Sequence, residues 1–261
     1  MEIDIYQVDA FANNMFEGNP AAVCPLKEWV SDELLQKIAA ENNLSETAFF
    51  VTKGDSFTLR WFTPEAEVDL CGHATLAAAH VLFQHLGYDK SAILFETKSG
   101  TLTVEKSEYG YRMSFPASIA EPIEPPAMLT KALGVKPVKT FAAFDYIVVL
   151  ENEAQINMLS PDFSMLQSLD LRGVVVTAPS KDVDFVSRCF FPKLKVNEDP
   201  VTGSAHCELA PYWSKTLSRN KLVGKQLSQR TGLVHCEVNG SRVTLSGNAV
   251  DYMSGIITLN L

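Results

Sequence analysis

Short apolar and alternating segments follow one another along most of the chain, which is the pattern of β-strands. In the first half these segments are 3–11, 47–52, 57–63, 92–97, 100–106 and 111–117. In the second half they are 145–151, 173–179, 184–191, 233–238, 242–247 and 255–261. Between two of them, Asn239-Gly240 is a strong signal for a hairpin turn. The pattern predicts a β-rich protein with few helices.

Helical periodicity is confined to a few segments. Residues 31–43 place apolar side chains on one face behind Ser31, which we expect to be the N-cap. The segment 73–87 is apolar nearly all round, so it predicts a helix buried on every side that stops at Gly87. Shorter candidates are 126–134, 162–170 and 204–211.

One unit of strand, turn and helix start occurs twice. The first copy begins R-W-F-T-P at Arg60 and reaches a helix start at Gly72. The second begins R-C-F-F-P at Arg188, about half a chain later, and reaches Gly203. Read in this way, Asp69 of the first turn matches Asp199 of the second. We therefore expect two similar β-rich domains, each built around a buried central helix.

Length and composition support this organisation. At 261 residues the chain exceeds a typical single domain, and the proline-rich segment 121–127 reads as the linker. The formal charge of −9, without a basic run, argues against a nucleic-acid partner. No apolar run has the length of a membrane span, and the N-terminus does not read as a signal peptide. The five scattered cysteines read as reduced thiols of a cytoplasmic protein.

The candidate chemistry lies at the two helix starts. A helix N-terminus binds anions through unpaired N–H groups, and glycine lets a ligand approach the backbone closely. Gly72-His73 and Gly203-Ser204 are therefore either ordinary turns or two anion sites around one small substrate. Glu46, next to the apolar run 47–51, is either a turn-stabilising carboxylate or a partly desolvated base with a raised pKa. Spacing alone favours the turn role for Glu46.

Other kinds of site are disfavoured. Cys71 and His73 are two residues apart, and side chains with that spacing diverge on a helix, so we do not expect a nucleophile–base pair. The spacing of His73, His80 and His85 does not match a metal-binding motif, nor does that of His206 and Cys207. The sequence contains no nucleotide-binding glycine motif. We expect neither a metal nor a cofactor.

Four ordered motifs resemble those of the PhzF-like phenazine-biosynthesis family, which belongs to the diaminopimelate epimerase superfamily. They are FEGNPAAV (16–23), NLSETAF (43–49), DLCGHATLAAAHVL (69–82) and EDPVTGSAHCELAPYW (198–213). The resemblance implies an α+β fold of two similar barrel-like domains, each around a central helix, related by a pseudo-twofold axis. We place the domains at 1–118 and 119–261, with the last strand, 254–261, as a candidate addition to the first.

The resemblance also implies a reaction. It is a cofactor-independent isomerisation in which a carboxylate moves a proton on a small carboxylic acid bound in the interdomain cleft. Glu46 matches the catalytic carboxylate, and His73 and Asp199 match residues that hold the substrate and assist the transfer. The matching substrate-binding residues are Asn19, Gly72, Gly203 and Ser204. The expected partner is the small-molecule carboxylate, and we allow for a homodimer.

One departure bears on the reaction. Epimerases of the superfamily use two thiols, one at each helix start, whereas here Cys71 stands at the first and Thr202 at the second. A hydroxyl is too weak an acid to replace a thiol at neutral pH, so a two-thiol racemase is disfavoured. Two alternatives to the isomerase stay open: a two-base amino-acid racemase or epimerase with other partners, and a non-catalytic small-carboxylate-binding protein on the same scaffold.

Overall fold

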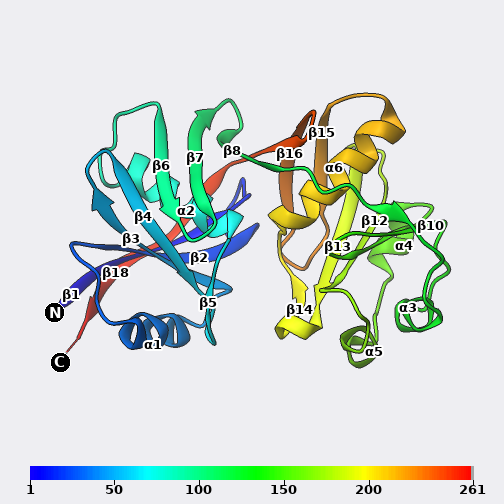
Figure 1. The fold of residues 1–261 in the computed structure, drawn as a ribbon, viewed down its shortest axis with the longest axis horizontal. Helices are drawn as coiled ribbons and strands as arrows, with labels where there is room; N and C mark the ends of the chain where they lie inside the picture. The colour runs from blue at the N-terminus through cyan, green and yellow to red at the C-terminus, as the bar shows by residue number, and fades with distance from the viewer. Residues whose placement is uncertain (260–261) are drawn as a thin grey trace. The chain divides into compact units, whose positions relative to one another are not determined.

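The structure is a computed structural model, and it describes residues 1–259 (Figure 1). The chain forms two compact units. The first comprises residues 1–114 together with the chain from residue 246 onward, and the second comprises residues 115–245. Each unit is described in turn.

The first unit contains most of the N-terminal strands and two helices. Its elements are β1 (Glu2–Ala10), β2 (Asn19–Leu26), α1 (Asp32–Asn42), β3 (Glu46–Lys53), β4 (Ser56–Phe62), β5 (Glu67–Val68), α2 (Gly72–Gln84), β6 (Ala92–Thr97), β7 (Gly100–Ser107), β8 (Gly110–Pro116) and β18 (Ala249–Thr258). Strand β1 lies between β18 and β2, antiparallel to both. Next come a parallel pair β2–β3 and an antiparallel pair β3–β4. Strand β4 pairs with β5 and, in parallel, with β6, and β6, β7 and β8 follow as antiparallel neighbours.

The second unit repeats this order. Its elements are β9 (Glu121–Pro122), α3 (Ala127–Leu133), β10 (Lys139–Ala142), β11 (Tyr146–Val149), α4 (Glu153–Asn157), α5 (Phe163–Gln167), β12 (Val174–Pro179), β13 (Phe185–Phe191), the 3₁₀ turn η1 (Pro192–Leu194), β14 (Val196–Asp199), α6 (Gly203–Leu217), β15 (Lys221–Gln226), β16 (Gly232–Asn239) and β17 (Arg242–Gly247). The pairings β10–β11 and β12–β13 are antiparallel, and β11–β12 is parallel. Strand β13 pairs with β14 and, in parallel, with β15, which pairs with β16.

The strand register corrects one detail of the repeat. In the first unit Trp61 pairs with Val68, four residues before the helix start at Gly72. In the second unit Cys189 pairs with Asp199, four residues before the helix start at Gly203. Asp199 is therefore the counterpart of Val68 and not of Asp69, because the second copy has a longer turn between its paired strands.

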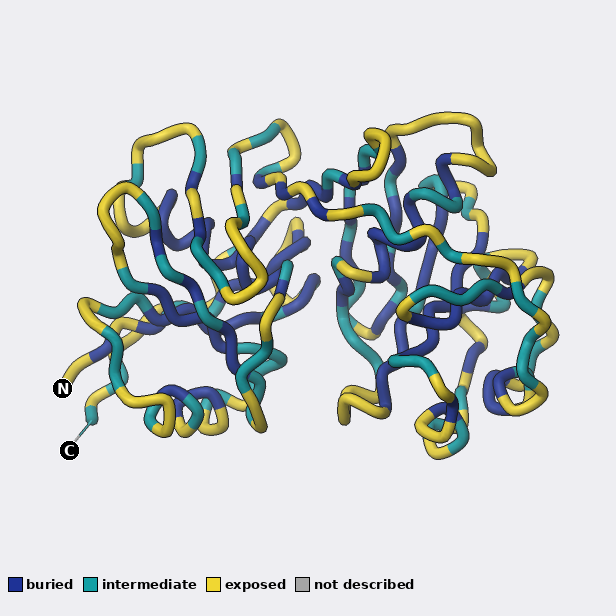
Figure 2. The backbone as a smooth tube through the Cα atoms, viewed as in Figure 1, coloured by how far each residue is buried: buried dark blue, intermediate teal, exposed yellow. Residues whose placement is uncertain are grey.

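The central helix of the first unit is buried as its composition predicts. Every residue of α2 from His73 to Phe83 is buried, and the helix packs against β1, β2 and β3 (Figure 2). Helix α1 starts as predicted, with Ser31 Oγ accepting a hydrogen bond from Leu34 N at 3.3 Å. Both features follow from the sequence, because apolar side chains all round a helix have to be covered on every side.

Helix α6 is longer than predicted. It runs to Leu217, with Pro211 in its interior, although proline removes one helical N–H donor. The carbonyl that loses this donor belongs to Cys207, and it accepts a hydrogen bond from Ser118 N at 3.0 Å instead. A residue distant in sequence thus replaces the missing helical hydrogen bond, so the helix continues past the proline.

The proline-rich segment 121–127 is not a free linker. Strand β9 pairs with β10, and Ile123 N donates to Thr140 O at 3.0 Å, so the segment begins as an edge strand of the second unit. An edge strand tolerates proline because its outer side has no partner strand. At the other end of the chain, β18 lies beside β1, while residues 260 and 261 of the predicted last strand lie outside the described residues.

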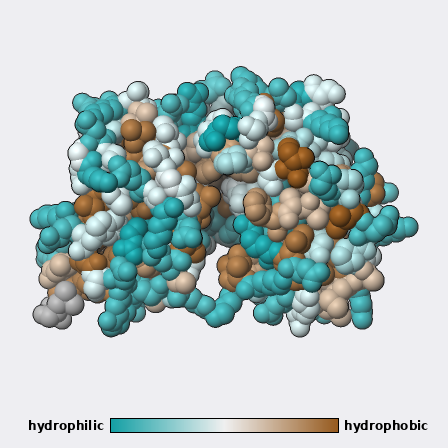
Figure 3. Space-filling model, in the orientation of Figure 1, coloured by the Kyte–Doolittle hydropathy of each residue, from teal (hydrophilic) through white to brown (hydrophobic). Residues whose placement is uncertain are grey.

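Each unit has its own apolar core. One large cluster in the second unit packs α3, α4 and α5 against β11 to β13, and one in the first packs α1 against β1 to β4. The visible surface carries mostly hydrophilic side chains, with apolar ones scattered among them (Figure 3). Among the described residues, no helix has the length and apolar character needed to cross a membrane.

Candidate active site

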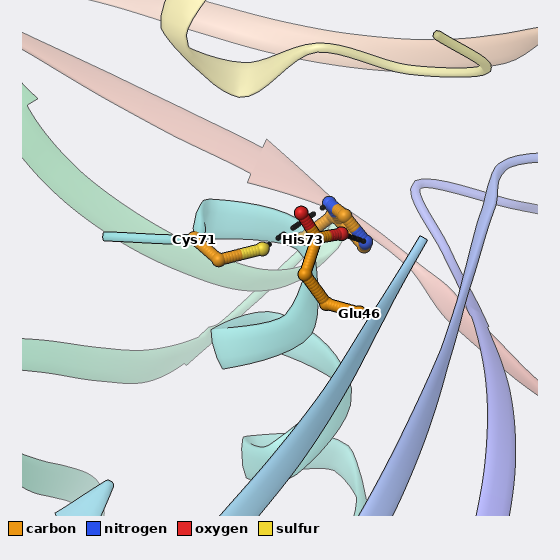
Figure 4. A group of neighbouring side chains, drawn as sticks. All are labelled: Glu46, Cys71 and His73. Carbon is orange, nitrogen blue, oxygen red and sulfur yellow. Dashed lines mark hydrogen bonds and ion pairs between the residues drawn. The ribbon is translucent and has the colours of Figure 1, made fainter. Parts of the chain in front are cut away.

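A carboxylate and an imidazole meet at the start of the central helix of the first unit. Glu46 is the first residue of β3, and His73 is the second residue of α2. Glu46 Oε2 lies 3.1 Å from His73 Nε2, and the two side chains are only 18% and 9% exposed (Figure 4). The structure therefore brings together two of the residues predicted from sequence. They belong to two motifs that are separate in the chain.

Cys71 lies on the other side of the same imidazole. Its Sγ is 3.5 Å from His73 Nδ1, so the expectation that these side chains diverge is wrong (Figure 4). The reason is the backbone: Cys71 is the N-cap of α2, with φ −145° and ψ 108°. An extended N-cap residue does not follow the helical geometry on which that expectation rested.

Burial and neighbouring charge act in opposite directions on His73. Burial by itself lowers the pKa of His73, but Cys71 and Glu46 raise it and prevail, so this pKa lies well above its ordinary value. Burial, reinforced by the charge of Glu46, raises the pKa of the Cys71 thiol. The raised pKa of His73 favours an imidazolium facing the Glu46 carboxyl group, and the raised pKa of Cys71 favours the neutral thiol.

The same three side chains could also surround an ion. One donor atom from each of Glu46, Cys71 and His73 lies within 4.8 Å of the others. A metal takes a thiolate and a neutral imidazole as ligands. Because the pKa values of Cys71 and His73 are both raised, an ion bound here would have to displace protons from them.

Two further predicted residues belong to elements that adjoin this group. Gly72 begins α2 and is half-buried. Asn19 begins β2 and is fully buried. Because Ala21 is in register with Glu46 on the parallel strand β3, Asn19 lies at the same end of this strand pair as Glu46.

In the second unit, Asp199 belongs to a hydrogen-bonded network at the start of α6. Thr202 Oγ1 donates to Asp199 Oδ2 at 2.5 Å. Gln226 accepts a hydrogen bond from Thr202 N at 2.9 Å and donates to Asp199 O at 2.7 Å. Thr202 therefore holds the Asp199 carboxylate, and Gln226 holds the backbone of Asp199. Gln226 comes from β15, and the sequence contains no signal for its part in this network.

Ser204 belongs to a second network on the same helix. Its Oγ accepts a hydrogen bond from Arg172 at 3.0 Å, and Arg172 also forms a two-point ion pair with the fully buried Asp145. Glu208 Oε1 accepts hydrogen bonds from Phe144 N at 3.0 Å and Asp145 N at 3.3 Å. Sequence patterns do not reveal this network, although the acid Glu208, next to the apolar Leu209 and Ala210, is a usable signal.

Glu208 holds its proton more tightly than an ordinary glutamate does. Burial, and then the nearby charge of Asp145, raise the pKa of Glu208 to about 8. The Asp145 carboxyl group faces the guanidinium of Arg172, which also donates the hydrogen bond to Ser204.

Gly203 leaves space beside the first turn of α6. A Cβ atom at this position would meet only Leu245 Cδ1, at an ordinary 3.7 Å, so packing within the protein does not require glycine. Ser204 next to it is exposed. The first N–H groups of a helix have no partner within the helix. An open, glycine-lined helix start of this kind is suited to an anion.

Comparison with known proteins gives one consistent result. The family profile described as phenazine biosynthesis-like protein matches residues 8–255. An uncharacterized isomerase of Pseudomonas aeruginosa is 52% identical over 99% of this chain and 100% of its own length. The crystal structure of a PhzF-family phenazine biosynthesis protein from Enterococcus faecalis is 48% identical, with a TM-score of 0.97 over 99% of this chain and 100% of that one.

A more distant structure extends the fold comparison. A hydroxyproline epimerase from Agrobacterium vitis has a TM-score of 0.64 at 9% identity, covering 99% of this chain and 93% of that one. At this identity only the fold is shared. The predicted α+β, epimerase-like fold class is confirmed by these structures.

Proposed function

The chain belongs to the phenazine biosynthesis-like family, and we propose that it is an isomerase that moves a proton on a small carboxylic acid without a cofactor. The observation that carries the proposal is the buried pair of Glu46 and His73, whose carboxyl and imidazole groups lie 3.1 Å apart at the start of α2. The relatives named isomerases support the reaction class.

In the proposed reaction Glu46 carries the proton. Its carboxylate removes a proton from a substrate carbon, so the C–H bond breaks and its electron pair enters the substrate's conjugated system. The protonated Glu46 then returns the proton to another carbon, where a new C–H bond forms. One group acts first as base and then as acid, which general acid–base catalysis allows when the group is close to both carbons.

His73 has a supporting part in this reaction. Its imidazolium holds the Glu46 carboxylate in place and is a positive charge next to the group that takes up the proton. A charge positioned in a buried site stabilises a developing anion more strongly than it would in water.

We further propose that the second unit binds the substrate's polar groups. The N–H groups at Gly203-Ser204 would receive the substrate carboxylate, and the fixed carboxylate of Asp199 would accept a hydrogen bond from a substrate hydroxyl or amino group. Gly72 and Asn19 have the corresponding binding role in the first unit. The homodimer and the cytoplasmic location stay predictions.

The test is a search for turnover by NMR. Small unsaturated and hydroxylated carboxylic acids are incubated with the protein in deuterated water, and shifted double bonds and deuterium uptake are recorded. Once a substrate is found, Glu46→Gln should lower turnover by about 10²–10⁴-fold, since the amide keeps the shape but cannot act as the base. Glu41→Gln, an exposed change on α1, is the matched control and should leave turnover unchanged.

Three results would contradict the proposal. Full turnover in Glu46→Gln would remove the assigned base. Loss of chirality in a panel of D- and L-amino acids, with solvent deuterium at the α-carbon, would indicate a two-base racemase. Ligand-induced thermal stabilisation without turnover of any ligand that binds would indicate a binding protein.

A further inference from the structure

A second group of side chains in the first unit has the composition of a metal site and takes no part in the proposed reaction. It consists of His80 on α2, His85 at the C-cap of the same helix, and Asp251 on β18. Their donor atoms all lie within 4.8 Å of one another. His80 is buried, His85 is 30% exposed and Asp251 is 47% exposed, so the group is anchored inside and opens to solvent.

We propose that His80, His85 and Asp251 bind one Zn²⁺ ion. Asp251 Oδ1 lies 3.2 Å from His80 Nε2 and 2.9 Å from His85 Nε2. Ligands at about 2.0–2.1 Å around a tetrahedral Zn²⁺ are separated by about 3.3 Å, so the two observed separations are close to the required ones. Two imidazoles and one carboxylate are a common donor set for this ion.

The buried imidazole is oriented from behind. His80 Nδ1 lies 3.0 Å from the hydroxyl of Tyr111, which also accepts a hydrogen bond from Gln84 at 3.2 Å. When Nδ1 of His80 donates to this oxygen, Nε2 presents its lone pair toward Asp251. Metal-binding histidines are held by outer hydrogen bonds of this kind.

The other two ligands are also positioned by their surroundings. The ring of His85 stacks on Tyr6 with 4.8 Å between centroids. Asp251 lies at a β-bulge between β1 and β18, where Gln7 pairs with Met253 and Val8 pairs with Asp251, leaving Tyr252 as the extra residue. A bulge changes the direction of the neighbouring side chain, which here brings the carboxylate to both imidazoles.

The site is separate from the Glu46–His73 pair. His80 follows His73 by two turns of α2, which is about 10 Å along the helix. A metal bound here would join the end of the central helix to β18, which is distant from it in sequence. We therefore assign the ion a structural role, with the solvent-facing side of the site left for a water ligand.

The experiment measures binding of Zn²⁺ alone by titration calorimetry on the purified, metal-stripped protein, with thermal unfolding in parallel. We expect one ion per chain, and a rise in the unfolding temperature of about 5 °C at a hundredfold excess over the dissociation constant. His85→Gln and Asp251→Asn change partly exposed side chains, so both should fold, and each should weaken binding at least tenfold. His235→Gln, on β16 of the second unit, is the matched control and should bind like wild type.

Co²⁺ in place of Zn²⁺ identifies the ligands. The proposed site should give the visible bands of a tetrahedral ion without the near-ultraviolet band of a thiolate ligand. A thiolate band that disappears in Cys71→Ser would place the ion at Cys71 instead and overturn the proposal. Equal binding in wild type and Asp251→Asn, or no binding in wild type, would also overturn it.

Discussion

The helix starts of the two units occupy the same place in the same order of strands, but they carry different chemistry. Gly72 of α2 and Gly203 of α6 correspond, so Cys71 corresponds to Thr202 and His73 to Ser204. At the first helix start the carboxyl, thiol and imidazole groups of Glu46, Cys71 and His73 are in contact. The second has hydrogen-bonding groups that are mostly occupied by one another.

What the two helix starts share is structural. In both helices, the side chain four residues after the N-cap residue bonds to the backbone carbonyl of that residue. Thr75 Oγ1 donates to Cys71 O at 2.5 Å, and His206 Nδ1 lies 2.8 Å from Thr202 O. The strand before each helix is also held in the same way, by a two-point Arg–Glu pair, Arg60–Glu67 and Arg188–Glu198. Both units thus keep the same stabilising interactions around the start of the helix.

The two units differ at the position of Glu46, which has a carboxyl group in the first unit and no side chain in the second. The register of β3 with β4, and of β12 with β13, makes Gly173 the counterpart of Glu46. A Cβ atom at Gly173 would lie 2.2 Å from Phe191 Cδ1 and 2.7 Å from Phe190 O, so no side chain fits. Packing therefore excludes a side chain, and with it a carboxyl group, at the position in the second unit that is equivalent to Glu46.

The first prediction concerns turnover and tests whether Asp199 corresponds to Val68 or to Asp69. Asp199→Asn should lower turnover by about 10²-fold, because the amide cannot supply the charge that holds and assists the substrate. Asp69→Asn is the matched control. Sequence spacing makes Asp69 the counterpart of Asp199, whereas the strand register makes Val68 the counterpart, so Asp69→Asn should have the smaller effect. Steady-state kinetics of both variants decides: a larger loss in Asp69→Asn would contradict the structural alignment.

A smaller effect on folding tests the packing argument. Gly173→Ala should lower the free energy of unfolding by about 1–3 kcal/mol, because the added methyl group overpacks the site beside Phe191. Gly203→Ala, with room for the methyl group, should change it by less than about 1 kcal/mol and weaken substrate binding instead. Urea unfolding measures the first quantity and KM the second. Equal stability of the two variants would refute the argument.

One carboxyl group in each unit should make stability depend on pH, and the two dependences should have opposite signs. Hydrogen bonding to Arg60 lowers the pKa of Glu67 to about 2, from an ordinary value of 4.5. The folded state then loses a proton more readily than the unfolded state, so stability is present above pH 4.5 and is lost as the pH falls toward 2. We expect hydrogen-exchange protection around Glu67 to weaken as the pH falls through this range, and Glu67→Gln to make the pH dependence of stability shallower there.

For Glu208 in the second unit the sign is reversed. Its pKa is raised from 4.5 to about 8, so the folded state keeps a proton that the unfolded state releases. The stabilising contribution is complete below pH 4.5 and declines as the pH rises to 8. Hydrogen exchange in the second unit should therefore quicken across this range in wild type more steeply than in Glu208→Gln. The same slope in both proteins would refute the assignment.

The smallest expected effect concerns the thiol. Cys71→Ser should keep turnover within about threefold of wild type. The reason is that in the proposed reaction Glu46 takes up the proton, whereas Cys71 only contacts His73. A serine hydroxyl of similar size still fits the N-cap. A loss as large as that of Glu46→Gln would show that Cys71 is a second acid or base, and would end the contrast between a one-base reaction and a two-thiol epimerase.

Local sequence determined the elements and the candidate residues. Alternating strands, the Ser31 cap and the largely apolar helix predicted at 73–87 follow from side-chain periodicity and local capping, because the need to bury apolar surface acts on each segment by itself. The two helix starts could be found from the repeat, and the motif resemblance identified Glu46 and His73 as catalytic candidates. Spacing alone favours a turn role for Glu46.

Tertiary structure decided what local patterns do not contain. The 3.1 Å approach of Glu46 to His73, the Ser118 hydrogen bond that lets α6 pass Pro211, and the alignment of Asp199 with Val68 each join segments distant in sequence. The Cys71–His73 contact depended on one extended N-cap residue. Periodicity reports which face of a segment is buried, whereas the partner of each side chain is set by strand register and packing across the whole unit.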